Sequence, residues 1–587
     1  QGSIPRLACF SSMLAATLSR PASRATRGLC ARAASSLIAS IDQGTSSSRV
    51  ILYDAVTLRP VASHQVELQS ATSNPQAGWS QMDAKRIVGT VTDSAAAALA
   101  AAGASASDVV GVGITNQRES TVVWDKRTGD PLYDCILWHD ARTATTVSAL
   151  ADELGGQDAL RATCGLPLST YFSGVKLRWL LETVPAVKEG FESGTALVGT
   201  VDSWLAWNLT GGAGGRATRH VSDVTNASRT MLMDLSSCGW DGGLVRALGV
   251  GAAEGALPTI VSCAEEIGRV DGGPLHGDAA HGEDWRPAGP SSHLQAVNRR
   301  RSRGGLETSR ALFTPPSCEQ VPLTGMIGDQ QAAMVGQRCF GVGEAKITYG
   351  TGAFMLVNSG GAPVPSSHGL LSTALYRFGA SAPTQYALEG AVASCAVGIN
   401  WFKDSLGMIG TAPEISSLAA QVPEGTEGLV FVPAFGGLLA PHWRDDARAT
   451  LVGLTLAHDK RHVARAVLEG IAHQAKEVTV CMAADTGAAL TGLRVDGGVA
   501  LSDELLQYQA DLCGIAVQRP RDVETTALGA AIAAGLGAGV WSSIADIPSS
   551  GDDIERTFEP AICEEERTAR CASWQKAVES SFGWARE

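Results

Sequence analysis

The chain has 587 residues, which is too many for a single hydrophobic core, so we expect two domains. Acidic residues outnumber basic ones by 59 to 46, and the net charge of −13 argues against nucleic acid as a partner. Thirteen cysteines without a Cys-x-x-Cys pair indicate reduced thiols, and the longest nearly uncharged stretch, Ala527–Trp541, is too short to span a bilayer and predicts a buried helix.

The N-terminal segment differs in composition from the rest of the chain. No acidic residue occurs from Met13 through Ile41, and Arg20, Arg24 and Arg27 are spaced to share one helical face. An arginine- and serine-rich start without acidic residues is typical of a mitochondrial transit peptide. A plastid location, or a cytoplasmic protein with a basic tail, is the alternative. We expect residues 1–36 to be a transit peptide or a disordered tail.

Strand patterns begin directly after this segment. Ser36–Ile41 and Arg49–Asp54 flank a Gly-Thr turn and predict a hairpin. A helix is expected over Asp83–Ala101, followed by strands over Val109–Thr115 and Ser120–Trp124.

The segment from 272 to about 318 interrupts the alternation of strands and helices. Gly, Pro, Ser, His and Arg dominate it, and its histidines fit no metal-ligand spacing. It cannot bury enough apolar surface to offset the entropy lost on ordering, so we expect a disordered insertion.

The second half repeats the pattern of the first hairpin. Glu344–Tyr349 and Ala353–Asn358 flank the turn Gly350-Thr351-Gly352, and a helix is expected from about Gly390 to Asp404. Leu493–Gly498 predicts a strand that ends in a Gly-Gly turn, where backbone can approach a nucleotide closely.

The two glycine-threonine turns, one in each half, are typical of a two-lobed protein that holds a polyphosphate. Backbone N–H groups and hydroxyls at such turns bind phosphate oxygens. Asp329, which ends an apolar run, would lie between the two turns. This arrangement predicts an ATP-dependent kinase that acts on a small hydroxyl compound.

Seven short motifs occur in one order along the chain and are together far more specific than any one of them. The motifs are Asp42–Arg49, Asn116–Thr121, Tyr171–Gly174, Gly199–Trp204, Thr225–Thr230, Gly328–Gln331 and Tyr349–Gly352. With them the chain resembles the glycerol kinases, in the sugar-kinase branch of the actin-like ATPase superfamily. The resemblance runs from about Leu37 to Trp584, apart from 272–318.

The resemblance implies an α/β fold with two ribonuclease-H-like (actin-like ATPase) domains around a central cleft. Residues 37–338 would form the N-terminal kinase domain, on the polyol and phosphate side, and 339–587 the C-terminal kinase domain, on the nucleotide side. It also implies ATP-dependent phosphorylation of glycerol to sn-glycerol 3-phosphate, with Mg²⁺ as cofactor and glycerol and ATP as ligands.

Phosphoryl transfer requires positioning, charge neutralisation and a base near the attacking hydroxyl. The resemblance assigns the base to Asp329 and the Mg²⁺ side to Asp42 together with Asp329. Asp42 would act through bound water, because Mg²⁺ keeps much of its hydration shell. For both residues the alternative is an aspartate that caps a turn or the helix Gln330–Gln337.

The polyol side needs groups that match hydroxyls. Arg118 can only donate and Glu119 can only accept, so the adjacent pair can fix two hydroxyls; the alternative is a surface ion pair. Trp138 and Phe354 would pack on the carbon chain, and each could instead belong to the core. In full, the implied polyol ligands are Arg118, Glu119, Trp138, Tyr171, Asp329, Gln330 and Phe354.

The nucleotide side is implied in the same way. Hydroxyls, turn N–H groups and one guanidinium suit the β- and γ-phosphates. Ser502 and Asn400 replace an asparagine and a glutamine that are usual in the family, so we expect loose nucleotide selectivity. The implied nucleotide ligands are Thr45, Ser46, Ser47, Arg49, Thr351, Gly352, Asn400, Gly498 and Ser502.

Two other functions remain open at this stage. The first is a kinase for another small polyol or a pentulose; Arg118-Glu119 followed by Trp138 favours glycerol, because a larger sugar would need the room that Trp138 fills. The second is a nucleotide-binding scaffold without turnover, against which the presence of Asp42, Arg49, Glu119 and Asp329 argues. A homo-oligomer is neither indicated nor excluded.

Overall fold

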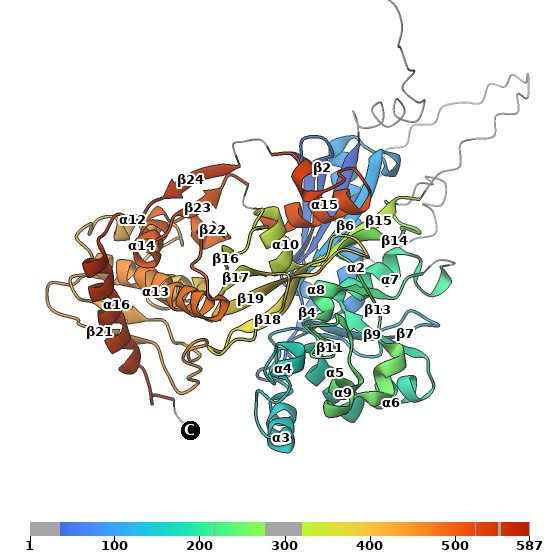
Figure 1. Cartoon of the computed structure of the whole chain (residues 1–587), viewed down its shortest axis with the longest axis horizontal. Coiled ribbons are helices and arrows are strands. Elements are labelled where there is room, and N and C mark those ends of the chain that lie inside the picture. The colour runs from blue at the N-terminus through green and yellow to red at the C-terminus, as the bar shows by residue number, and fades with distance from the viewer. Residues whose placement is uncertain (1–35, 216–217, 276–319, 523, 550–552, 586–587) are drawn as a thin grey trace, which may run out of the picture.

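The computed structural model describes residues 36–215, 218–275, 320–522, 524–549 and 553–585. The expected transit segment, except its last residue, and most of the expected insertion lie outside these residues. The described chain forms two lobes, each built on a mixed β-sheet with helices around it (Figure 1). No helix in these ranges is both long and apolar enough to cross a membrane.

The first lobe contains a six-stranded sheet in the order β14-β15-β6-β1-β2-β3. β1 pairs antiparallel with β2 and parallel with β6, while β2 pairs antiparallel with β3 and β6 parallel with β15. The strands are β1 Leu37–Gln43, β2 Ser47–Asp54, β3 Pro60–Glu67, β6 Val109–Asn116, β14 Ala264–Arg269 and β15 Pro322–Gly328.

The second lobe contains a seven-stranded sheet in the order β18-β19-β17-β16-β22-β23-β24. Its five inner strands repeat the order and directions of the five strands β3-β2-β1-β6-β15. The expected pair of ribonuclease-H-like domains is confirmed. The strands are β16 Glu344–Tyr349, β17 Ala353–Gly360, β18 Leu371–Tyr376, β19 Gln385–Val392, β22 Gly492–Asp496, β23 Val517–Pro520 and β24 Ile554–Phe558.

The other elements surround these two sheets. A smaller sheet of the first lobe contains β4 Thr72–Ser73, β5 Gln81–Met82, β7 Thr121–Asp125, β8 Cys135–Ile136 and β9 Ala196–Thr200; β10 Val221–Asp223 pairs with β13 Thr259–Val261, β11 Met233–Asp234 with β12 Gly239–Trp240, and β20 Val430–Val432 with β21 Thr450–Val452. The helices are α2 Ala84–Ala102, α3 Ala144–Leu154, α4 Arg161–Cys164, α5 Ser173–Thr183, α6 Pro185–Glu192, α7 Val201–Leu209, α8 Val224–Ala227, α9 Gly242–Ala247, α10 Asp329–Gly336, α11 Ala396–Asn400, α12 Glu414–Ala419, α13 Lys460–Thr486, α14 Asp503–Cys513, α15 Thr525–Gly537 and α16 Glu564–Glu579.

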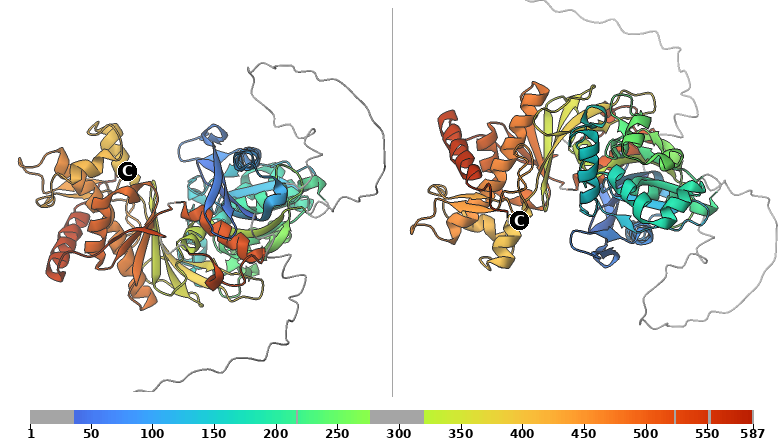
Figure 2. Two further views of the ribbon diagram at one scale, coloured as in Figure 1. Left: turned by 90° about the horizontal axis from the view of Figure 1, so that it is seen from above. Right: turned by 90° about the horizontal axis from the view of Figure 1, so that it is seen from below.

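Helix α15 crosses from the second half of the chain to the first lobe. It lies beside β2 and β6 in Figure 1, and Figure 2 shows the same red helix against the blue strands from above. The Ser40 hydroxyl donates to the Ala527 carbonyl at 2.6 Å, and the Thr324 hydroxyl donates to the Ala534 carbonyl at 2.9 Å. The buried helix expected from composition is confirmed, but a division at 338/339 does not describe where α15 packs.

One expected helix is shorter than the sequence pattern indicated. Gly390 to Val392 belong to β19, because they pair with β17 in the second sheet. The helix starts at Ala396, and a π-helical turn, Trp401–Ser405, follows it. An apolar run of this length fits either period, and the neighbouring strand decides between them.

Candidate active site

The candidate site lies at the ends of β1, β6 and β15, where the first lobe faces the second sheet. Parallel strands bring their carboxyl ends to one edge of a sheet, where α/β folds bind ligands. Asp42 is the next-to-last residue of β1, and Asp329 is the first residue of α10, directly after β15. Asp42 lies within a strand, opposite Arg49, and the N-cap of α10 is Gly328. Asp42 is therefore not a turn residue, whereas the Asp329 carboxylate accepts from Gln330 N at 2.7 Å in the first turn of the helix.

The two carboxylates influence each other. Burial raises the pKa of Asp42 to about 7, against the opposing charge of Arg49, and the charge of Asp329 raises it further. Ionising such a carboxylate is costly, and a second carboxylate nearby adds to that cost. A bound cation would offset both effects, so the pair suits a cation. Within the described ranges, no group of three or more His, Cys, Asp or Glu side chains could hold a metal by itself. Two carboxylates fit Mg²⁺, which keeps several of its waters.

Arg118 and Glu119 form the turn after β6 and are both buried, with 3% and 1% of their surfaces exposed. A surface ion pair is thereby excluded. Glu119 has φ of 59°, a left-handed conformation that is strained for a side chain of this size and is often found at functional sites. The hydroxyls of Thr121 and Ser173 both donate to the Glu119 carbonyl at 3.0 Å and hold this conformation.

The Arg118 guanidinium connects several acidic groups. Its Nε lies 3.1 Å from Asp329 Oδ1, and its two Nη atoms donate to the carboxylate of Glu389 at 2.6 and 2.9 Å. Arg229 Nε donates to Glu119 Oε1 at 2.6 Å. Neither Arg229 nor Glu389 was expected at the site from the sequence. A charged residue inside the apolar strand β19 was the one signal for Glu389, because charges are rarely buried unless paired.

Three aromatic side chains of the candidate site lie close together. The ring centroid of Trp138 lies 5.4 Å from that of Tyr171 and 6.1 Å from that of Phe354. Phe354 belongs to β17 of the second lobe, so both lobes contribute to the cluster. Trp138 Nε1 donates to Thr45 Oγ1 at 2.9 Å, which links the aromatic cluster to the first phosphate turn.

Two buried lysines support the site and were missed in the sequence. Lys176 Nζ donates to the carbonyl of Thr170 at 2.9 Å and to that of Tyr171, and burial lowers its pKa to about 7. Lys346 Nζ donates to Gln330 Oε1, and burial lowers its pKa to about 8. Each lysine therefore positions a residue expected on the polyol side.

The two phosphate turns are tight hairpin ends. Gly44 N donates to the Ser47 carbonyl at 2.9 Å, and Gly350 N donates to the Gly352 carbonyl at 2.9 Å. A Cβ at Gly352 would lie 2.8 Å from the Val392 carbonyl, so a side chain does not fit there. Thr45 and Ser47 are half-buried, and Ser46 and Thr351 are exposed.

Arg49, expected on the phosphates, is engaged by protein groups. Its Nε donates to Gln65 Oε1 at 2.7 Å, and its Nη1 forms an ion pair with Glu524. Glu524 is 42% exposed at its side chain, so a phosphate can compete for the guanidinium without uncovering a buried charge.

The residues expected near the adenosine lie on the second lobe. Asn400 ends α11 and is exposed, and Gly498 is an exposed residue just after β22. Ser502 is buried and caps α14: its hydroxyl accepts from Leu505 N at 3.3 Å and contacts the Ser416 hydroxyl at 2.7 Å. Its contact with a base stays a prediction.

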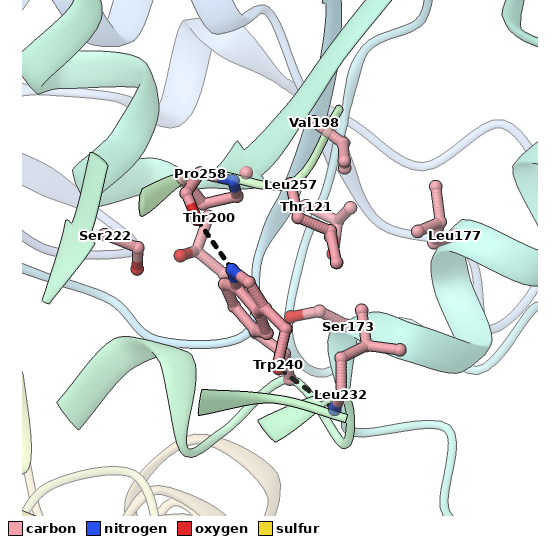
Figure 3. Close-up of a pocket in the computed structure, with 12 residues that line it drawn as sticks. Thr121, Ser173, Leu177, Val198, Thr200, Ser222, Leu232, Trp240, Leu257 and Pro258 are labelled. Carbon is pink, nitrogen blue, oxygen red and sulfur yellow. Dashed lines mark hydrogen bonds between the residues drawn. The ribbon is translucent and has the colours of Figure 1, made fainter. Parts of the chain in front are cut away.

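A small cavity lies behind Glu119 in the first lobe. Figure 3 shows Trp240 among the residues that line it, and the indole N–H donates to the Pro258 carbonyl at 2.6 Å. The cavity volume of about 20 Å³ admits a water molecule but not a polyol. Its wall includes Thr121 and Ser173, which fix the Glu119 backbone, so the cavity belongs to the support of the site.

Comparisons with known proteins agree with this geometry. Residues 37–273 match the N-terminal domain model of the FGGY family of carbohydrate kinases, and residues 345–538 match its C-terminal domain model. A glycerol kinase of Arabidopsis thaliana is 46% identical over 564 residues, which cover 93% of this chain and 98% of that protein. A glycerol kinase of Brucella anthropi is 44% identical over 547 residues, or 93% of this chain and 99% of that protein.

Solved structures show the same fold. Plasmodium falciparum glycerol kinase with ADP superposes with a TM-score of 0.80 at 32% identity, covering 93% of this chain and 98% of that chain. Xylulose kinase from Rhodospirillum rubrum shares the fold with a TM-score of 0.71 at 22% identity, covering 93% and 97%. The chain therefore belongs to the FGGY family of carbohydrate kinases.

Proposed function

We propose that the protein is an ATP-dependent glycerol kinase that transfers the γ-phosphoryl group of ATP to glycerol and yields sn-glycerol 3-phosphate. The observation that carries the proposal is the group formed by buried Arg118 and Glu119 and half-buried Asp329, which offers donors and acceptors for hydroxyls. Glycerol kinases that are 42–46% identical to this chain, matched over nearly their full length, support it.

Arg118 donates to glycerol hydroxyls and Glu119 accepts from them, so the hydroxyl to be phosphorylated is held against Asp329. Asp329 accepts the proton of that hydroxyl as it attacks the γ-phosphorus, and ADP leaves on the opposite side. The side chains and N–H groups of the two turns hold the phosphates from both lobes.

Mg²⁺ would be held near Asp42 and Asp329 and would neutralise negative charge on the phosphoryl group during its transfer. Asp42 fits this position because its side chain is half-buried and the charge of Arg49 offsets only part of the rise in its pKa that burial causes. Arg49 would exchange its pairing with Glu524 for a phosphate oxygen of ATP.

The aromatic cluster supports a small triol over a larger sugar. The ring centroid of Trp138 lies 5.4 Å from that of Tyr171 and 6.1 Å from that of Phe354. The hydrogen bond from Trp138 Nε1 to Thr45 Oγ1 holds the indole in place. A pentulose would require this cluster to open.

A coupled assay that measures ADP release with a panel of polyols tests the function. We expect glycerol to give the highest kcat/KM with ATP and Mg²⁺, and a pentulose to be used far more weakly. Higher kcat/KM with a pentulose would replace glycerol by that sugar, and no turnover with any polyol would support a nucleotide-binding scaffold instead.

We further propose that the protein acts in the mitochondrion. The support is the acid-free, arginine-bearing composition of residues 13–41. Fusing residues 1–40 to a fluorescent protein tests this, and a plastid or cytoplasmic signal would contradict it.

A further inference from the structure

The carboxylate of Glu389 connects the two lobes within the candidate site. Glu389 belongs to β19 in the second sheet and is 1% exposed. Its partners Arg118 and Arg229 both belong to the first lobe, 271 and 160 residues away along the chain. The contact therefore lies at the junction of the lobes, where Ala387 of the same strand shares a hydrophobic core with Ile38 and Ile327 of the first lobe.

The geometry of these contacts is shared between the two arginines. Glu389 Oε2 accepts from Arg118 Nη1 at 2.6 Å, and Glu389 Oε1 accepts from Arg118 Nη2 at 2.9 Å and from Arg229 Nη2 at 3.2 Å. A bidentate contact of this kind fixes the plane of a guanidinium as well as its position.

Each arginine keeps a second edge for a residue of the proposed polyol site. Arg118 Nε lies 3.1 Å from Asp329 Oδ1, and Arg229 Nε donates to Glu119 Oε1 at 2.6 Å. Because a guanidinium is planar and rigid, the orientation that Glu389 imposes on one edge determines where the other edge points. Glu389 thus acts on both Asp329 and Glu119 without touching either.

The charges agree with this arrangement. Burial alone would raise the pKa of Glu389, but Arg118, Arg229 and Lys346 outweigh it and lower the pKa to about 2, so Glu389 stays ionised at any working pH. Burial raises the pKa of Glu119 against the same two arginines, and the charge of Glu389 raises it further. Of the two carboxylates that share the arginines, Glu389 is the fixed anion.

We propose that Glu389 is a positioning residue for the polyol site, contributed by the second lobe, which orients Arg118 and Arg229 and so makes polyol binding depend on contact between the lobes. This inference rests on the proposed function. The site is complete only with this residue of the second lobe, because Arg118 and Arg229 take their orientation from it.

The test is Glu389→Gln, which keeps the shape and removes the charge. We expect kcat/KM for glycerol to fall about 10- to 100-fold, mainly through a higher KM. The reason is that the hydrogen bonds from Arg118 and Arg229 to a charged carboxylate are lost or weakened. The KM for ATP should stay within about twofold. Glu389→Asp, which keeps the charge but is shorter, should recover part of the loss.

The matched control is Glu344→Gln, on β16 of the same sheet, where the carboxylate lies 3.8 Å from Arg494 away from the site. It should leave both KM values unchanged. Thermal unfolding with and without Mg²⁺ATP checks that each variant folds and binds nucleotide. If Glu389→Gln does not fold, Glu389→Asp decides, and it should raise the KM for glycerol at least fivefold with that for ATP unchanged.

Equal effects on both substrates, or none on glycerol, would overturn the positioning role and leave Glu389 as a structural ion pair. The assay starts with the wild-type protein, which separates the two proposals. If the wild type phosphorylates a different polyol, the proposed substrate is wrong, and the Glu389 variants are then compared on that polyol.

Discussion

At the residue scale, Asp329 combines access with a fixed position. Its side chain is 29% exposed, and it is held by Arg118 at 3.1 Å at the start of α10. An asparagine in its place keeps the size and the hydrogen bonds but cannot accept a proton at neutral pH.

We therefore expect Asp329→Asn to fold normally and to bind glycerol while losing about 10²- to 10⁴-fold in kcat, the range typical of a lost general base. Steady-state kinetics with saturating ATP and glycerol measure this. More than half of the wild-type kcat in the variant would show that Asp329 is not the base.

Asp42 leads to a prediction about protons. Burial raises its pKa to about 7, so near pH 6.5 a large share of the free protein carries a proton on Asp42. A bound cation favours the ionised form. Mg²⁺ATP binding should therefore release a proton near pH 6 to 7 and release none from this group near pH 9, where Asp42 is already ionised.

Isothermal titration calorimetry in two buffers of different ionisation enthalpy measures that release. Asp42→Asn, which has no proton to give, is the matched comparison and should lose the release near pH 6.5. The same proton release in Asp42→Asn and wild type would place the titrating group elsewhere.

At the element scale, the contact between α15 and the first sheet depends on glycine. A Cβ at Gly113 would lie 2.2 Å from the Ala530 carbonyl and 3.1 Å from the Ala534 Cβ. The helix can approach the strand this closely only because both surfaces carry small residues.

Gly113→Ala should thus lower the free energy of unfolding by about 2 kcal/mol or more, in the range of overpacked cores. Gly89→Ala in α2 is the control, because nothing lies within 4 Å of its added Cβ. It should raise stability by about 0.5–1 kcal/mol. Urea unfolding of both variants gives the comparison, and equal stabilities would mean that α15 does not depend on this approach.

At the scale of the whole molecule, the segment between β14 and β15 leaves and re-enters the fold at one place. Arg269 pairs with Pro322 in the sheet, and Gln320 Nε2 donates to Asp271 Oδ1 at 3.4 Å. Leu275, near the start of the expected insertion, is 2% exposed and lies in a hydrophobic core of the first lobe. Residues 276–319 lie outside the described chain.

Because the two ends are close, replacing 276–319 with a short Gly-Ser linker should cost little free energy, and activity should stay within about twofold. Glycerol phosphorylation by the shortened protein measures this. A loss greater than tenfold with an unchanged melting temperature would assign the segment a part in the reaction.

The sequence by itself determined the elements whose pattern is local. The two hairpins, α2, and α15 as a buried helix follow from periods and turn residues within a few positions, and the ordered motifs led to the expected fold and family. The end of β19 was missed because an apolar run there fits a helix as well as a strand until its partner β17 is known.

Only the tertiary structure decided which distant residues meet. Glu389 lies beside Arg118 and Arg229, and α15 packs on the sheet of the first lobe, although in each case the partners lie far apart in the sequence. Neither contact has a local signature, since hydrogen bonds across 160 or 271 residues depend on strand order and lobe contact, not on spacing. A charged residue that is buried needs a partner, and the fold alone specified that the partners of Glu389 are Arg118 and Arg229.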